Sequence, residues 1–170
     1  GKTGKYIEVH KNADDGIEFF GGSVQVKYYV GTGNQDDTLD GDDGWNGSAQ
    51  HVILQHYPGD AGSLIEADGD ADDVFPAATA ILANITAISS AATDSGFNFK
   101  SDANYDVYNS VLDMSAADAN AAIADDDSTV EFDGTLITDG TIPSDKLTAF
   151  NSGTGNEVRD GSNSGIQTAI

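Results

Sequence analysis

The stretch Asp14-Asp15-Gly16-Ile17-Glu18-Phe19 decides the fold, because its pattern returns along the chain. The pattern is a turn rich in Asp or Gly, then a small residue, an apolar residue and a polar or acidic one. Further copies lie at residues 36–40, 63–67, 95–99 and, more faintly, 121–124. The apolar members recur at steps of 22, 26, 32 and 26 residues. These members are Ile17, Leu39, Ile65, Phe97 and Ile123. Each step suits one coil of a solenoid.

A second series consists of strands rich in β-branched and aromatic residues. They lie at 26–30, 49–54, 82–86, 107–111 and 130–133, and their first members recur at steps of 23, 33, 25 and 23 residues. Those first members are Val26, Ala49, Leu82, Val107 and Val130. Strands that recur once per coil stack in parallel about 4.7 to 4.9 Å apart, so equivalent residues form ladders. The sequence therefore predicts an all-β fold, a right-handed parallel β-helix of about five coils.

The predicted coils occupy residues 1–137, and the pattern then decays into Gly, Ser, Asn and Asp. We expect residues 138–170 to form an irregular polar C-terminal tail, which caps the coils or pairs with a neighbouring molecule by strand addition. The competing interpretation is an Ala-rich α+β domain with helices at 77–92 and 115–127. Ile81, Ile85, Thr86 and Ile88 argue against the first of these helices, because β-branched side chains lose rotamer freedom in a helix.

The ladders predict which side chains face inward. The first apolar series should form an inward ladder, and Asn84 with Asn109 should add a short inward amide ladder. His51 shares a ladder position with Tyr28 and Asn84, so we expect it in the core, whereas His10 and His56 end strands and should face solvent. Glu18, Asp40 and Glu66 each follow the apolar ladder by one residue and should face solvent, stacked coil over coil.

The composition limits the partners. Seven basic and 29 acidic residues give a formal charge of -22, and only five of the acidic residues are Glu. Such a surface repels nucleic acid and anionic lipid, so neither is an expected partner. The apolar runs are far shorter than the roughly 20 residues of a membrane span, which argues against membrane insertion. There is no cysteine, so neither disulfides nor thiolate chemistry contribute.

The stretches 14–22, 36–45, 65–68, 82–86 and 107–111 together resemble a group of secreted or surface-anchored parallel β-helix proteins of marine and environmental bacteria. The resemblance covers roughly residues 3–137 and implies an exported, extracellular or cell-surface protein. It implies no catalytic residues. Compared with that group, the chain begins inside its first coil, so we expect a processed mature protein or a fragment of a longer chain.

Calcium binding is the sharpest chemical hypothesis. Asp and Glu supply the hard oxygen ligands that Ca²⁺ takes in six- to eight-coordinate sites. The candidate ligands lie on the acidic ladder and in the adjoining turns: Asp14, Asp15, Glu18, Asp36, Asp37, Asp40, Asp42, Asp43, Glu66 and Asp68. The spacing matches neither an EF-hand loop nor the nonapeptide calcium repeat, and solvated turn aspartates are the alternative.

Carbohydrate chemistry is the other open hypothesis. The stacked carboxylates of Glu18, Asp40 and Glu66 suit the separation of about 5 to 9.5 Å that glycoside hydrolases use, although any acidic ladder would. A polysaccharide lyase is disfavoured because the basic residues are few and scattered. Trp45 with Tyr29, Tyr57 and Tyr105 is a candidate platform for sugar rings, although single aromatic residues at coil corners more often cap the core.

We therefore expect a non-enzymatic extracellular structural or adhesive β-solenoid, stabilised by calcium and assembling end to end into a surface filament or matrix. Its expected partners are further copies of itself or neighbouring domains of a longer chain, and an extracellular glycan. The alternative is a carbohydrate-binding module or a glycoside hydrolase acting on a neutral polysaccharide.

Overall fold

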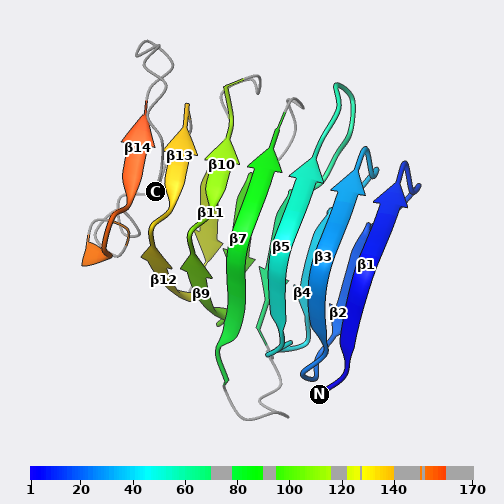
Figure 1. The fold of residues 1–170 in the computed structure, drawn as a ribbon, viewed down its shortest axis with the longest axis horizontal. Coiled ribbons are helices and arrows are strands. Elements are labelled where there is room, and N and C mark those ends of the chain that lie inside the picture. The colour runs from blue at the N-terminus through cyan, green and yellow to red at the C-terminus, as the bar shows by residue number, and fades with distance from the viewer. Residues whose placement is uncertain are drawn as a thin grey trace.

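The strands form two stacked parallel sheets, and each of the first five coils contributes to both (Figure 1). The computed structural model describes residues 1–69, 78–89, 95–115, 122–126, 128–139, 150 and 152–159. Sheet A contains nine of the described strands, and sheet B contains five. Sheet A consists of β1 (Thr3–His10), β3 (Gln25–Thr32), β5 (Ser48–Gln55), β7 (Ala80–Ile88), β9 (Asn104–Tyr108), β10 (Val111–Asp113), β12 (Thr129–Asp133), β13 (Leu136–Thr138) and β14 (Glu157–Arg159). Sheet B consists of β2 (Ile17–Phe20), β4 (Leu39–Asp42), β6 (Ile65–Asp68), β8 (Phe97–Lys100) and β11 (Ile123–Asp126).

The register of sheet B confirms the predicted apolar ladder. Ile17 pairs with Leu39, Leu39 with Ile65, Ile65 with Phe97, and Phe97 with Ile123, all in parallel. Ile17 in the first coil is half-buried, and the other four side chains are buried. The predicted parallel β-helix of about five coils is therefore correct, and the α+β alternative is wrong for residues 80–88, which form β7. Most of the second helix of that alternative lies outside the described residues.

The second predicted ladder, in sheet A, is correct for four of its five members. Val26, Ala49, Leu82 and Val107 lie opposite one another on successive strands. The fifth assignment is wrong, because Val130 pairs with Tyr105, and Phe132 is the residue opposite Val107. A shift of two residues keeps the same face of a strand buried, so the sequence pattern alone could not distinguish the two registers.

A bend crosses sheet A at one residue of every coil. Tyr6, Tyr28, His51, Asn84 and Asn109 all have positive φ, between 47° and 60°, and Gly134 continues the series at 65°. The ladder pairing skips Tyr6, Tyr28, His51 and Asn84, one residue on each partner strand, so the register is the same on both sides of the bend. In the later coils the bend divides the strand, since Asn109 separates β9 from β10 and Gly134 separates β12 from β13. We call these residues the bend column.

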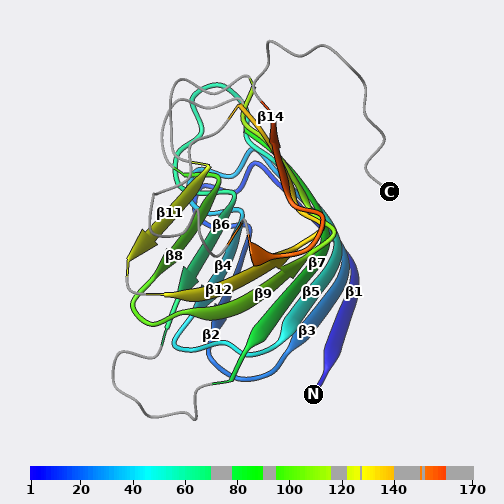
Figure 2. The same cartoon turned by 90° about the vertical axis from the view of Figure 1, so that its left-hand side faces the viewer.

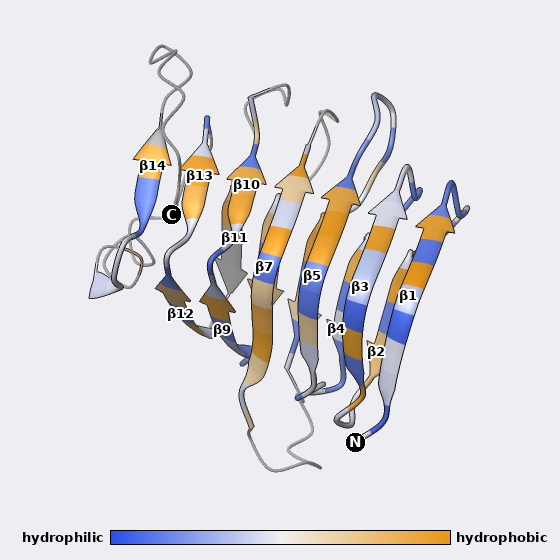
Figure 3. Ribbon diagram, viewed as in Figure 1, coloured by the Kyte–Doolittle hydropathy of each residue, from blue (hydrophilic) through white to orange (hydrophobic). Residues whose placement is uncertain are grey.

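The core fills the space between the two sheets, which the view in Figure 2 shows in cross-section. Figure 3 shows polar and apolar bands alternating along β1. In β5 the buried residues Ala49, Val52 and Leu54 alternate with more exposed ones on either side of the bend, so each strand buries one face. Aromatic rings pack along the core from coil to coil: Phe99 lies against Tyr105 and Phe132, with ring centroids 5.6 and 6.3 Å apart. Phe132 in turn contacts the buried Phe150, at 5.4 Å.

Part of the expected tail joins the fold. β14 pairs in parallel with β13, and Leu136 lies opposite Glu157. The remaining residues of 140–170, apart from 150 and 152–159, lie outside the described part of the chain. The division of the chain at residue 137 stays a prediction. Within the described residues, no helix has the length and hydropathy needed to cross a membrane.

Candidate functional site

The outer face of sheet B carries an acidic patch in two columns. The first column runs Glu18, Asp40, Glu66 and Asn98, which pair across successive strands. Two residues further along each strand lie Phe20 on β2, Asp42 on β4, Asp68 on β6 and Lys100 on β8. We define the acidic patch as Glu18, Asp40, Asp42, Glu66 and Asp68, with Lys100 as its cation. The predicted stacking of Glu18, Asp40 and Glu66 is correct.

The exposure predicted for this ladder is wrong for Asp40. Only 6% of its surface is exposed, whereas Glu18 is exposed and Glu66 is half-buried. Asp40 is buried because it lies between the longer side chains of Glu18 and Glu66 on the neighbouring strands. Burial, with the negative charge of Glu66 next in importance, raises the pKa of Asp40 to about 8. Its Oδ1 atom is buried and has no hydrogen-bond partner.

Lys100 neutralises the β6 side of the patch. Its Nζ atom lies 2.8 Å from Oε2 of Glu66 and 3.6 Å from Oδ2 of Asp68. Burial disfavours the charged amine, but the hydrogen bond and charge of Glu66 outweigh it and raise the pKa of Lys100. Asn98 adds a hydrogen bond from Nδ2 to Oε1 of Glu66, at 3.1 Å. Sequence reasoning missed Lys100, although it follows Phe97 by three residues, as Asp42 follows Leu39 and Asp68 follows Ile65.

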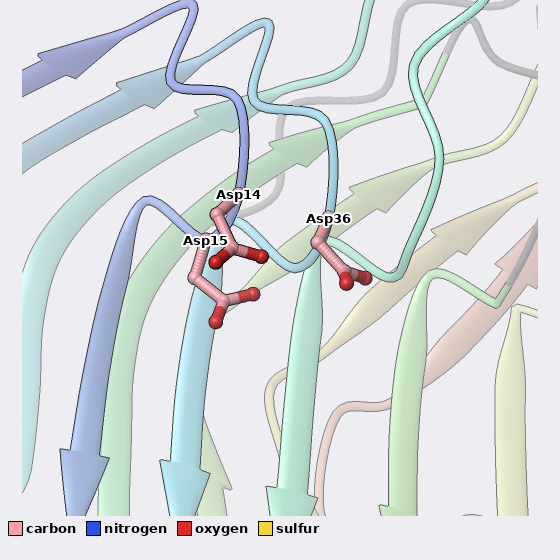
Figure 4. A group of neighbouring side chains, drawn as sticks. All are labelled: Asp14, Asp15 and Asp36. Atoms are coloured by element: carbon pink, nitrogen blue, oxygen red, sulfur yellow. The ribbon is translucent and has the colours of Figure 1, made fainter.

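The turns before sheet B bring further carboxylates together. Figure 4 shows Asp14 and Asp15 in the turn before β2 and Asp36 in the neighbouring turn before β4. One oxygen from each of these three residues lies within 4.8 Å of the other two. The same holds for two groups that share Asp40: Asp15, Asp37 and Asp40, and Glu18, Asp40 and Asp42. Of the ten predicted ligands, these groups contain seven, and Asp43, Glu66 and Asp68 lie outside them.

Asp15 and Asp37 already bind the backbone of the next coil. Oδ1 of Asp15 accepts a hydrogen bond from the amide of Asp37, at 3.0 Å. Oδ1 of Asp37 accepts one from the amide of Ser63. Burial raises the pKa of Asp37 to about 7 despite this hydrogen bond, and burial together with the charge of Asp36 raises the pKa of Asp15. These two residues therefore act as links between the coils.

The outer face of sheet A holds a groove beside the bend column. The rings of Tyr6 and Tyr28 stack with centroids 5.0 Å apart, and Tyr28 stacks on His51 at 5.3 Å. Tyr6 is 80% exposed and Tyr28 is 39% exposed. The stack and Asn84 form one side of a groove of about 580 Å³, which crosses β1, β3, β5 and β7. Glu8, Val30, Ile53 and Thr86 also line this groove.

The bend column corrects several predictions. His51 is exposed rather than part of the core, and Asn84 and Asn109 align on the outer surface rather than inside. The residue with positive φ interrupts the alternation of faces, so that in β3 the buried residues Val26 and Tyr29 are three positions apart, which a strict period of two does not anticipate. His10 is exposed as expected, whereas His56 is buried and its prediction is wrong.

The predicted aromatic platform is not formed by the expected residues. Trp45, Tyr29 and Tyr105 are buried in the core, and Tyr57 is half-buried with its ring edge-on to His10, at 6.2 Å between centroids. The polar edge of each buried ring finds a backbone carbonyl: Nε1 of Trp45 donates to Val24, and the hydroxyls of Tyr29 and Tyr105 donate to Thr38 and Gly41. Tyr6 and Tyr28 supply the exposed rings instead, and stacked aromatic residues one coil apart are the signal that could have identified them.

Two stacked parallel sheets with ladders running from coil to coil define a parallel β-helix protein. The family model for the pectate-lyase-like β-helix domain matches residues 1–167, and the chain belongs to this family. Comparisons with curated proteins and with solved structures give no match. The expected membership of a parallel β-helix family is confirmed, while bacterial origin, secretion and surface attachment stay predictions.

Proposed function

We propose that this chain is a non-enzymatic adhesive β-solenoid that binds a neutral glycan along the groove of sheet A. The observation that carries the proposal is the exposed stack of Tyr6, Tyr28 and His51, which forms one side of that groove. Concave surfaces that combine aromatic rings with a few polar groups are the usual sites for small ligands.

The geometry suits an extended ligand. The groove spans four neighbouring strands, so a chain-like ligand would run from coil to coil along the solenoid. One face of Tyr6 stacks on Tyr28, and its high exposure leaves ring surface available to a sugar ring. Hydroxyl and imidazole groups of the stack, with Asn84, Thr86 and Glu8, offer donors and acceptors to sugar hydroxyls.

The charge favours a neutral glycan over an acidic one. A formal charge of -22 slows the approach of a uronate polymer, and the residues that line the groove include no Lys or Arg. They include one carboxylate, Glu8, whereas glycoside hydrolysis generally uses two that flank the bond. Binding without cleavage therefore fits the groove better than hydrolysis does. The family description, which names a pectate-lyase-like domain, supports a polysaccharide as the class of ligand.

This role places the protein outside the cell or on its surface, where glycans are accessible. Glycan binding is compatible with the structural role expected from the sequence. In the first coil Ile7, Val9, Ile17 and Phe19 pack against the core but remain only partly buried, and this apolar end supports contact with a further coil or a second copy. End-to-end assembly stays a proposal, which particle length in negative-stain electron microscopy tests.

The test is affinity electrophoresis in gels that contain neutral polysaccharides, namely a xylan, a mannan and a mixed-linkage β-glucan, with a polygalacturonate gel for comparison. Retardation in a neutral gel is expected. Tyr28→Asn removes the central ring and keeps a residue type that the bend column itself carries at Asn84. Phe20→Ala, which removes an exposed ring on sheet B, is the matched control.

Loss of retardation in Tyr28→Asn but not in Phe20→Ala would support the groove as the binding site. Equal retardation of both variants, or retardation by polygalacturonate alone, would overturn the proposal. A parallel reducing-sugar assay decides between binding and hydrolysis, because release of reducing ends would show that the chain is an enzyme.

A further inference from the structure

The acidic patch on sheet B contains one buried carboxylate, Asp40, with an oxygen atom that has no hydrogen-bond partner. Asp40 is 94% buried, and its Oδ1 atom has no hydrogen-bond partner. A buried ionised oxygen without a partner is costly, so such an atom is usually met by a cation, a water or a proton. Carboxylate oxygens of Asp40 belong to two groups of three ligand atoms, each within 4.8 Å of the others. The side chain of Asp40, which carries the unpartnered Oδ1 atom, therefore points toward other oxygen donors.

Lys100, the cation of the patch, pairs with the carboxylates of β6 rather than with those of β2 and β4. Lys100 on β8 contacts Glu66 and Asp68 on β6. Among the described residues, these two contacts are the ion pairs that the structure gives for the patch. Carboxylate oxygens of Glu18 on β2 and Asp42 on β4 lie within 4.8 Å of an oxygen of Asp40, so the negative charges of the three groups repel one another. The β2–β4 half thus concentrates charge without a basic side chain.

We propose that Glu18, Asp40 and Asp42 form a calcium site on the outer face of sheet B. Ligands that surround one Ca²⁺ at about 2.3 to 2.6 Å lie at most about 5 Å from one another, which the spacing of these oxygens allows. All three donors are carboxylates, which is the ligand chemistry of calcium rather than of softer metals. The exposed position of Glu18 leaves the outer side open to the waters that complete a calcium shell.

This group of three suits the ion better than the group formed by Asp15, Asp37 and Asp40. Asp15 and Asp37 each commit one oxygen to a backbone amide of the next coil. Moving these side chains to coordinate an ion would disturb the links between coils. Glu18 is exposed and unbranched, so it can adjust its position at little cost.

The site would connect two coils. Glu18 belongs to β2 in the first coil, and Asp40 and Asp42 belong to β4 in the second. An ion bound between them would replace repulsion across the pair of strands with attraction to a shared charge. Because the ion would bind only where the coils are stacked, calcium should stabilise the folded chain, and the gain should grow with the logarithm of its concentration above the dissociation constant. The calcium site lies on sheet B and is independent of the glycan groove on sheet A.

The experiment compares thermal unfolding by circular dichroism in excess calcium and in EDTA, at matched ionic strength, with calcium affinity from isothermal titration calorimetry. At saturating calcium we expect the midpoint of the intact chain to rise by about 5 °C or more. Asp40→Asn and Asp42→Asn should lose the rise and the calorimetric binding. Glu131→Gln removes one exposed carboxylate from sheet A and should behave like the intact chain.

Asp40→Asn replaces a buried carboxyl group with a neutral group of the same shape that cannot ionise, so in EDTA it should be at least as stable as the intact chain. Loss of the calcium response in this variant is then not a consequence of unfolding. The same rise in Asp40→Asn as in the intact chain, or no rise in either, would overturn the site. An equal rise with magnesium would indicate general screening of the acidic surface and would also overturn it.

Discussion

Asp37 accepts a hydrogen bond from the backbone amide of Ser63, the residue that occupies the same position one coil later. The amide of Asp37 itself donates to Asp15 one coil earlier, so the contact repeats along the turns before sheet B. Each link joins a side chain of one coil to the backbone of the next. In this chain some of the turn aspartates therefore have a structural role that does not require a metal.

Asp37→Ala should destabilise the chain by about 1 to 3 kcal/mol, because the buried amide of Ser63 loses its acceptor. Asp37→Asn should be close to neutral, because its amide oxygen can accept the same hydrogen bond and the buried charge is gone. Urea unfolding followed by circular dichroism measures both variants. Equal losses in the two variants would mean that the charge of Asp37, rather than the hydrogen bond, stabilises the turn.

Stability without calcium should fall as pH rises from about 4 to about 8. Burial raises the pKa of Asp37 to about 7 and that of Asp40 to about 8, whereas an unfolded aspartate titrates near pH 4. Across this window the folded chain holds more protons than the unfolded chain, so the free energy of unfolding decreases with pH and levels off above it. The charged groups around Asp40 are the carboxylates of Asp15, Glu18, Asp37, Asp42 and Glu66, with Lys100 as the cation of the patch.

The measurement is urea unfolding in EDTA at about pH 5 and about pH 8, between which most of the fall should occur. Asp40→Asn should show a smaller fall between the two conditions than the intact chain. Stability that rises across this interval would contradict the prediction, because it would require carboxylates whose pKa is lowered by folding to outweigh Asp37 and Asp40.

The sequence was sufficient to predict the coils and the ladder of sheet B. The steps between Ile17, Leu39, Ile65, Phe97 and Ile123 are uneven, yet each spans one coil, because insertions fall in the turns and leave the strands aligned. Once that ladder is placed, the stacking of Glu18, Asp40 and Glu66 follows directly from the alternation of faces.

The bend column could not be predicted in the same way. Tyr6, Tyr28 and His51 have positive φ, which large side chains seldom adopt, so nothing in their local sequence indicates a bend. If the strand were regular, the alternation of its faces would place His51 in the core, whereas the bend places it on the surface. The burial of Asp40 and the role of Lys100 depend on residues 22 to 34 positions away in the chain, so the residue pattern alone could not establish them.

Phe97→Ala should cost about 3 to 5 kcal/mol, because this ring is fully buried in the ladder and lies between Ile65 and Ile123. Phe20→Ala removes the same side chain from an exposed position on the same sheet and should change stability by less than about 0.5 kcal/mol. Denaturant unfolding of the two variants checks the predicted difference. Similar losses would mean that the ladder position does not determine the packing.

Lys100→Gln should lower stability by about 1 kcal/mol or less, because the ion pairs with Glu66 and Asp68 are partly exposed. The loss should shrink as sodium chloride screens the repulsion among the remaining carboxylates. Lys5→Gln removes an exposed lysine from sheet A and measures the general effect of making the chain more negative. Thermal unfolding of both variants at low and high salt separates the two contributions. A loss in Lys100→Gln that equals the loss in Lys5→Gln at every salt concentration would mean that Lys100 acts only through net charge, and that its contacts across β6 and β8 contribute nothing measurable.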